Sequence, residues 1–169
     1  MREETTATLR VLTFNIRLEM DVDEPGGNAW TSRVASVVET IRRSDADVVA
    51  VQEALPTQLQ ALQAALEDYR SVGRGREPGG TGEHVPILYR RERVDLESHR
   101  DFWLSANPEE EGSRGWDAEN PRICTAAVFT ARRSPLRFAL FNTHLDHRGP
   151  TSRIESAYLI LKRMAEVPD

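Results

Sequence analysis

The chain has 169 residues, of which 39% are hydrophobic and 29% charged, and it carries a formal net charge of −5 at pH 7. This composition is typical of one soluble globular domain, and the acidic balance excludes a global basic field, so nucleic acid would have to be bound by local arginines or a metal ion. Its one cysteine, Cys124, excludes an internal disulfide, and neither an N-terminal apolar signal core nor a stretch of roughly 20 apolar residues is present, so we expect a cytoplasmic protein without a membrane span.

The first third of the chain predicts a strand–helix–strand unit. Residues 9–16 (LRVLTFNI) mix alternation with β-branched residues, residues 31–43 place their valines at helical spacing, and residues 46–53 (ADVVAVQE) form a nearly unbroken apolar run. Such a unit places its two strands parallel. Asn15 and Glu53, at the carboxyl ends of the two strands, are therefore expected at the same edge of one sheet.

The rest of the chain predicts one more helix and several strands. Residues 57–69 carry leucines on one face and predict a helix, and the Gly-rich residues 73–83 predict a flexible loop whose arginines could contact phosphate. Residues 84–104 and 122–145 each predict a β-hairpin, separated by an irregular stretch, 105–121. No repeat or linker divides the chain, so we expect a single mixed α/β domain over residues 1–169.

Polar side chains at the strand ends suggest a site for a phosphate and a cation. Asn15, Glu53, Asn142 and His144 each have an ordinary structural explanation alone, as turn caps or solvated groups. Together, however, an amide and a carboxylate supply the oxygen ligands that Mg²⁺ or Mn²⁺ prefers. The stretch NTHLDH, residues 142–147, also invites a zinc site, but Asn142 occupies the first histidine position of the metallo-β-lactamase-like pattern.

Seven short motifs in this order resemble the endonuclease/exonuclease/phosphatase family, the deoxyribonuclease-I-like metal-dependent phosphoesterases. They are TFNIR, VQE, GRGREPGGTGEHVPILYR, DFWLS, GWD, NPRICT and NTHLDH, and within the family they are most similar to a bacterial branch of generic hydrolases. The resemblance runs from about Leu9 to the end of the chain. It implies an α/β fold, a two-sheet α-β-β-α sandwich with the active site at one edge of both sheets.

The resemblance also implies a role for each matching residue. Glu53 and Asn15 would be the metal-site residues, with Glu53 binding the cation directly and Asn15 shaping the water or phosphate environment. His144 would hold the scissile phosphate and Glu83 would support that histidine through a hydrogen bond, which favours its charged form. Arg122 is similar to a strand arginine that contacts phosphate.

Three neighbouring residues have expected roles that are less specific. Asn142 is expected among the phosphate-binding residues together with Arg122 and Asn15, and Asp146 as an assisting catalytic residue beside His144 and Glu83. His147 is left open between a functional and a structural role.

The chain departs from the family pattern in one large respect. Members continue with a Gly-Asp-Phe-Asn segment and end with a Ser-Asp-His segment, and neither occurs in these 169 residues. We therefore expect an N-terminal portion of a Mg²⁺-dependent (or Mn²⁺-dependent) phosphoesterase acting on a phosphorylated small molecule or nucleic acid. The alternatives are a catalytically silent phosphate-binding module and a fragment completed by a partner. An uncovered sheet face, prone to self-association, is also expected.

Overall fold

The computed structural model describes residues 8–168, so residues 1–7, part of the segment in which no signal core was expected, lie outside the described residues. Short 3₁₀ helices, Asp21–Asp23 and Pro78–Gly80, lie between the main elements. The main elements, in chain order, are β1 (Val11–Asn15), α1 (Trp30–Ser44), β2 (Val48–Gln52), α2 (Pro56–Ala65), β3 (Tyr69–Val72), β4 (Gly75–Glu77), β5 (Thr81–His84), β6 (Ile87–Arg90), β7 (Val94–Trp103), β8 (Ile123–Ala131), β9 (Arg137–Thr143) and α3 (Pro150–Met164).

The strands form two main sheets and one small ribbon. The first sheet has the order β1-β2-β6-β3, in which β1 and β2 are parallel and Asn15 lies opposite Gln52. The second sheet, β7-β8-β9, is antiparallel, and β4 pairs with β5 in a separate ribbon. The expected parallel strand–helix–strand unit is therefore confirmed.

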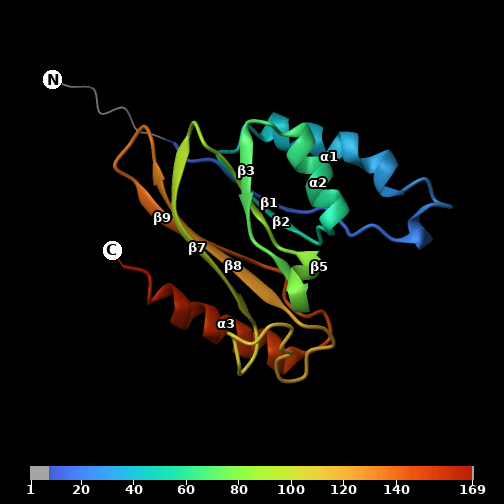
Figure 1. Ribbon diagram of the computed structural model, residues 1–169, viewed down its shortest axis with the longest axis vertical. Coiled ribbons are helices and arrows are strands. Elements are labelled where there is room, and N and C mark those ends of the chain that lie inside the picture. Colours follow the sequence, from blue (N-terminus) through green and yellow to red (C-terminus); the bar gives the residue numbers. More distant parts are fainter. Residues whose placement is uncertain (1–7, 169) are drawn as a thin grey trace.

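The two main sheets pack face to face between helices. In Figure 1, α1 and α2 lie on one side of the molecule and α3 on the opposite side. Apolar side chains of α1 and α2 pack on β2, whereas Val48 and Ile87 of the first sheet meet Phe129 of the second. On the outer face of the second sheet, Phe102 and Cys124 contact residues of α3. The four layers confirm the predicted α-β-β-α sandwich.

Three sequence predictions about local structure are wrong. The helix predicted over 57–69 ends at Ala65, because Tyr69 is buried, begins β3 and donates its hydroxyl to the backbone oxygen of Ala46 at 2.6 Å. The supposed flexible loop contains the β4-β5 ribbon, in which a Cβ at Gly75 would meet Thr81 O at 2.0 Å. The two strands predicted within 84–104 exist, but β6 and β7 belong to different sheets and form no hairpin.

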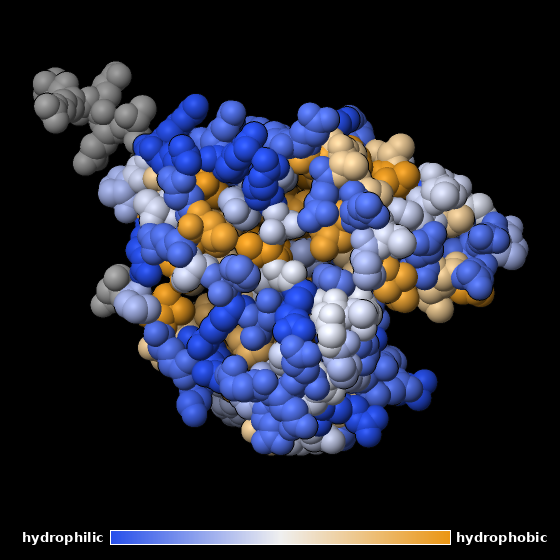
Figure 2. All heavy atoms as spheres, viewed as in Figure 1, coloured by the Kyte–Doolittle hydropathy of each residue, from blue (hydrophilic) through white to orange (hydrophobic). Residues whose placement is uncertain are grey.

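The exposed apolar surface differs from the expected uncovered sheet face. Helices cover the outer face of each main sheet, and exposed apolar residues lie instead on the edge strand β1, at Val11, and along α3, at Ile154, Tyr158 and Leu161. Figure 2 shows apolar side chains scattered across the upper part of one face of the molecule. None of the helices in residues 8–168 has the length and apolar character of a membrane span.

Candidate functional site

Glu53 and Asn15 lie together where β2 and β1 end. The Asn15 amide donates a hydrogen bond of 2.7 Å to Glu53 Oε1, and the backbone N–H of Leu18 donates to Glu53 Oε2 at 3.0 Å. Burial alone would raise the pKa of Glu53, but these two hydrogen bonds, with His144 and Arg17 nearby, hold it below its ordinary value. Glu53 also has a left-handed backbone conformation, with φ of 63°. The site therefore contains a fixed, ionised carboxylate.

His144 follows β9 and reaches the same edge from the second sheet. Its Nε2 is 3.7 Å from Glu53 Oε1 and its Nδ1 is 3.5 Å from Arg122 Nη1. Burial, followed by the Arg122 cation, lowers the pKa of His144, while Glu53 and Glu83 oppose this shift. The neutral imidazole is thus favoured at pH 7, contrary to the charged form expected from the sequence.

Glu83 faces His144 as expected, but no direct hydrogen bond joins them, and the expected alternative of a bridge through one water molecule stays a prediction. Glu83 Oε2 lies 4.0 Å from His144 Nδ1, which is too far for a direct bond. Glu83 Oε1 is instead 2.7 Å from Arg76 Nη2. Because Arg76 holds the carboxylate, Glu83 faces His144 without a direct bond to it.

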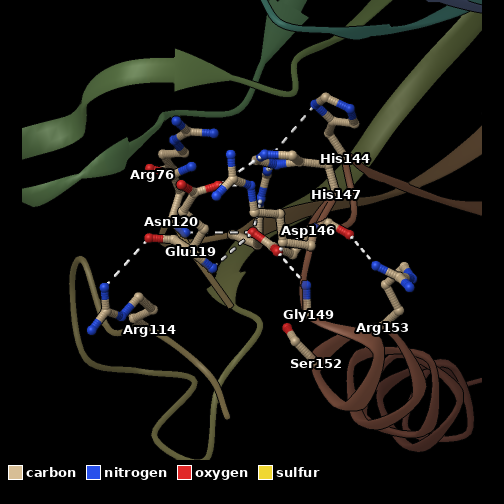
Figure 3. Close-up of polar contacts among 12 residues, drawn as sticks. Arg76, Arg114, Glu119, Asn120, His144, Asp146, His147, Gly149, Ser152 and Arg153 are labelled. Atoms are coloured by element: carbon tan, nitrogen blue, oxygen red, sulfur yellow. Dashed lines mark hydrogen bonds and ion pairs between the residues drawn. The ribbon is translucent and has the colours of Figure 1, made fainter. Parts of the chain in front are cut away.

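Asp146 is buried at the centre of a hydrogen-bond network (Figure 3), and Arg122 belongs to the same network. Arg122 Nε lies 3.2 Å from Asp146 Oδ2, and Arg122 Nη2 donates to His147 Nδ1 at 3.2 Å. The carboxylate also accepts four backbone hydrogen bonds, from Glu119, Asn120, Arg148 and Gly149.

These contacts give Asp146 a structural position rather than the predicted catalytic one. Burial would raise the pKa of Asp146, but the backbone hydrogen bonds keep it well below its ordinary value. With its side chain fully enclosed, Asp146 cannot touch a substrate. It fixes Arg122 and joins two loops, while His147 reaches Glu119 at 2.9 Å and belongs to the same network.

Asn142 points into the protein instead of toward a substrate, contrary to its predicted phosphate-binding role. It is buried, its amide donates to the backbone oxygens of Val51 and Pro86 at 2.7 and 2.9 Å, and its oxygen accepts from Gln52 Nε2 at 2.7 Å. These bonds join β9 of the second sheet to the first sheet. Sequence reasoning missed Gln52, although a polar residue ending an apolar run was a visible signal.

The site offers oxygen donors that fit a hard cation. Glu53 is ionised, and each of its oxygens accepts only one hydrogen bond from the described residues, which leaves lone pairs for Mg²⁺ with its retained waters. The Asn15 amide orients Glu53, and its oxygen accepts one hydrogen bond, from the backbone N–H of Arg17 at 2.9 Å, so its expected place in the metal site stays a prediction. Within residues 8–168 no group of three His, Cys, Asp or Glu side chains is arranged to hold a metal, as zinc would require.

A family model described as the endonuclease/exonuclease/phosphatase family matches residues 12–148. The chain belongs to this family. A family protein from Bacteroides thetaiotaomicron superimposes with a TM-score of 0.90 at 36% identity, covering 94% of this chain and 58% of that one. A mannosyl-6-phosphatase from Bacteroides thetaiotaomicron VPI-5482 gives 0.91 at 36% identity, covering 94% of this chain and 60% of that one.

A further family protein, from Bacteroides vulgatus, gives a TM-score of 0.90 at 38% identity, with 94% of this chain and 60% of that chain covered. This endonuclease/exonuclease/phosphatase domain therefore spans about three fifths of the length of these relatives. No curated protein matched the chain. The family model and these superpositions together show the endonuclease/exonuclease/phosphatase fold in this chain.

Proposed function

We propose that this chain provides the phosphate-binding and metal-binding part of a Mg²⁺-dependent or Mn²⁺-dependent phosphoester hydrolase. The observation that carries the proposal is the meeting of Glu53 and His144, 3.7 Å apart, at one edge of both sheets, with Arg122 behind them. A carboxylate for a cation and nitrogen donors for phosphate oxygens are the groups that phosphoryl transfer requires.

Each residue then has a defined task. Glu53 would hold the cation, which when bound neutralises charge on the phosphoryl oxygens. Asn15 orients the Glu53 carboxylate through its 2.7 Å hydrogen bond. Burial and Arg122 lower the pKa of His144 and favour its neutral imidazole. This ring would donate Nε2–H to a phosphate oxygen, while Arg122 fixes it from the Nδ1 side.

We expect this chain to bind phosphate but to hydrolyse phosphoesters only slowly. Within residues 8–168 the three carboxylates around His144 are all engaged, Glu53 by Asn15, Glu83 by Arg76 and Asp146 by Arg122. With Glu53 assigned to the cation and the other two paired with arginines, we propose that none of them serves as the general base toward a water molecule. This observation favours the second candidate, a phosphate-binding module that needs further residues to become an active enzyme.

A phosphorylated small molecule is the substrate class that we favour over nucleic acid. The net charge of −5 opposes the binding of a long polyanion. One relative with 36% identity is a mannosyl-6-phosphatase, which acts on a sugar phosphate by its name. We also propose weak self-association, through the exposed apolar residues of β1 and α3, which gel filtration over a range of concentrations would test.

The experiment that tests the proposal combines calorimetry with a hydrolysis assay. Mg²⁺ and Mn²⁺ are titrated into the wild-type protein and into Glu53→Gln, with the exposed helix residue Glu39→Gln as the matched control. We expect cation binding that Glu53→Gln weakens and Glu39→Gln does not. We expect this chain to hydrolyse p-nitrophenyl phosphate and bis-p-nitrophenyl phosphate far more slowly than the mannosyl-6-phosphatase from Bacteroides thetaiotaomicron does. Equal cation binding by all three proteins would remove Glu53 from the site.

A further inference from the structure

A small cleft beside His144, here called the arginine cleft, has room for a single oxygen atom. It is lined by Arg76, Glu83, Val85, Arg122, Ile123 and His144, and its volume is about 10 Å³. A volume of this size corresponds to roughly one water molecule. An oxygen atom therefore fits, whereas an oxygen that carries a carbon substituent does not.

Arg76 lines this cleft, and one nitrogen of its guanidinium has no hydrogen-bond partner among the described residues. Its side chain is only 13% exposed, and a hydrogen bond of 2.6 Å from Trp103 Nε1 to its backbone oxygen fixes its position. Nη2 is paired with Glu83 at 2.7 Å, but Nε is buried and has no hydrogen-bond partner within residues 8–168, since Glu77 Oε1 is 3.6 Å away. A buried donor without a partner is uncommon and is satisfied when an acceptor enters.

The small size of the cleft matters because phosphomonoesters and phosphodiesters differ in the number of unsubstituted phosphate oxygens. A phosphomonoester has three unsubstituted oxygens besides its leaving group, and a phosphodiester has two. A cation held by Glu53 and the imidazole of His144 would account for two of them. The third oxygen of a monoester can enter the arginine cleft, whereas the second ester group of a diester is too large for it.

We infer that Arg76 is a specificity-determining residue that admits a terminal phosphomonoester and excludes phosphodiesters. The inference rests on the proposed function, because it takes Glu53 and His144 as the groups that hold the phosphoryl group. Arg76 acts through an N–H donor aimed at the third oxygen, while the walls of the cleft exclude a substituted one. Glu83 serves as the positioning residue that holds the Arg76 guanidinium.

Anion binding to this chain tests the inference without requiring turnover. Methyl phosphate and dimethyl phosphate are titrated at pH 8 with Mg²⁺ and followed by calorimetry, with wild-type protein, Arg76→Gln and Arg76→Lys. Arg74→Gln is the matched control, because it removes the same charge two residues away, from a side chain that pairs with Glu111 and lies over Trp103. Thermal melting of each variant establishes that it is folded.

We expect wild-type protein to bind methyl phosphate more tightly than dimethyl phosphate. Arg76→Gln should weaken methyl phosphate binding by roughly tenfold, as expected for a lost charged hydrogen bond, and leave dimethyl phosphate binding nearly unchanged. Arg76→Lys should keep the ion pair with Glu83 yet restore the preference only in part, because lysine lacks the planar fork of donors. Arg74→Gln should retain the wild-type preference.

Two results would overturn the inference and separate it from the proposed function. If wild-type protein binds both anions alike, or if Arg76→Gln weakens both by the same factor, then Arg76 is only a structural partner of Glu83. If wild-type protein binds neither anion in the presence of Mg²⁺, the proposed function fails together with the inference.

Discussion

Replacement of Asp146 by alanine should destabilise the fold far more than an ordinary surface substitution. The carboxylate is buried with Arg122, of which 4% of the side chain is exposed, and removing one partner of a buried ion pair costs about 3–5 kcal/mol. The four backbone N–H groups that donate hydrogen bonds to Asp146 would also lose their acceptor. Water can replace this acceptor where the loops are exposed. For a chain of this size, the loss corresponds to a fall in Tm of roughly 6–20 °C.

Urea denaturation followed by far-UV circular dichroism measures this free energy of unfolding. Asp146→Asn should lose less than Asp146→Ala, because it keeps the shape and one oxygen acceptor. Asp95→Ala is the matched control, since its ion pair with Arg132 is half exposed and such pairs contribute about 0–1 kcal/mol. A loss for Asp146→Ala no larger than for Asp95→Ala would refute the structural role of the network.

Three other expectations concern the sheets, the histidines and the cysteine. Asn142→Ala should lower the free energy of unfolding by about 2–4 kcal/mol, because it breaks the hydrogen bonds between the two sheets, including that to Gln52; a loss below 1 kcal/mol in urea denaturation would contradict this. Burial lowers the pKa of His84, and burial together with Arg122 lowers the pKa of His144. The unfolded chain therefore binds more protons than the folded chain as pH falls through about 6.5. The free energy of unfolding should accordingly decrease from pH 7 to pH 5. A Tm series should show this slope reduced in His84→Asn, and an unchanged slope would exclude His84. Burial raises the pKa of the Cys124 thiol, so Ellman's reagent should not react with it at pH 8 until urea is added; rapid reaction in buffer would contradict its burial.

Elements defined by local periodicity could be predicted from the sequence, whereas pairing between distant strands could not. The apolar run at β2 and the helical spacing of α1 are local signals, and both elements form as expected. The partners of β6 and β7 depend on contacts far along the chain, which a short turn between two strands does not reveal. The end of α2 depends likewise on a distant hydrogen bond from Tyr69 to Ala46.

The site shows the same division between local and tertiary information. Glu53 and Asn15 lie together because parallel strands end at the same edge of a sheet. The direction of a side chain at a strand end is a tertiary property, however. Asn142 bridges the two sheets, and Asp146 accepts hydrogen bonds from two loops. The spacing of residues in NTHLDH predicts neither contact.

The left-handed backbone of Glu53 makes thermal stability compete with the cation binding that we propose for this residue. Glycine adopts such a conformation at no steric cost, whereas for other residues it costs on the order of 1–3 kcal/mol. A directed-evolution library selected only for survival of heating should therefore enrich glycine at this position and discard the carboxylate. An engineered version that tolerates heat and still binds a cation has to gain its stability elsewhere in the chain.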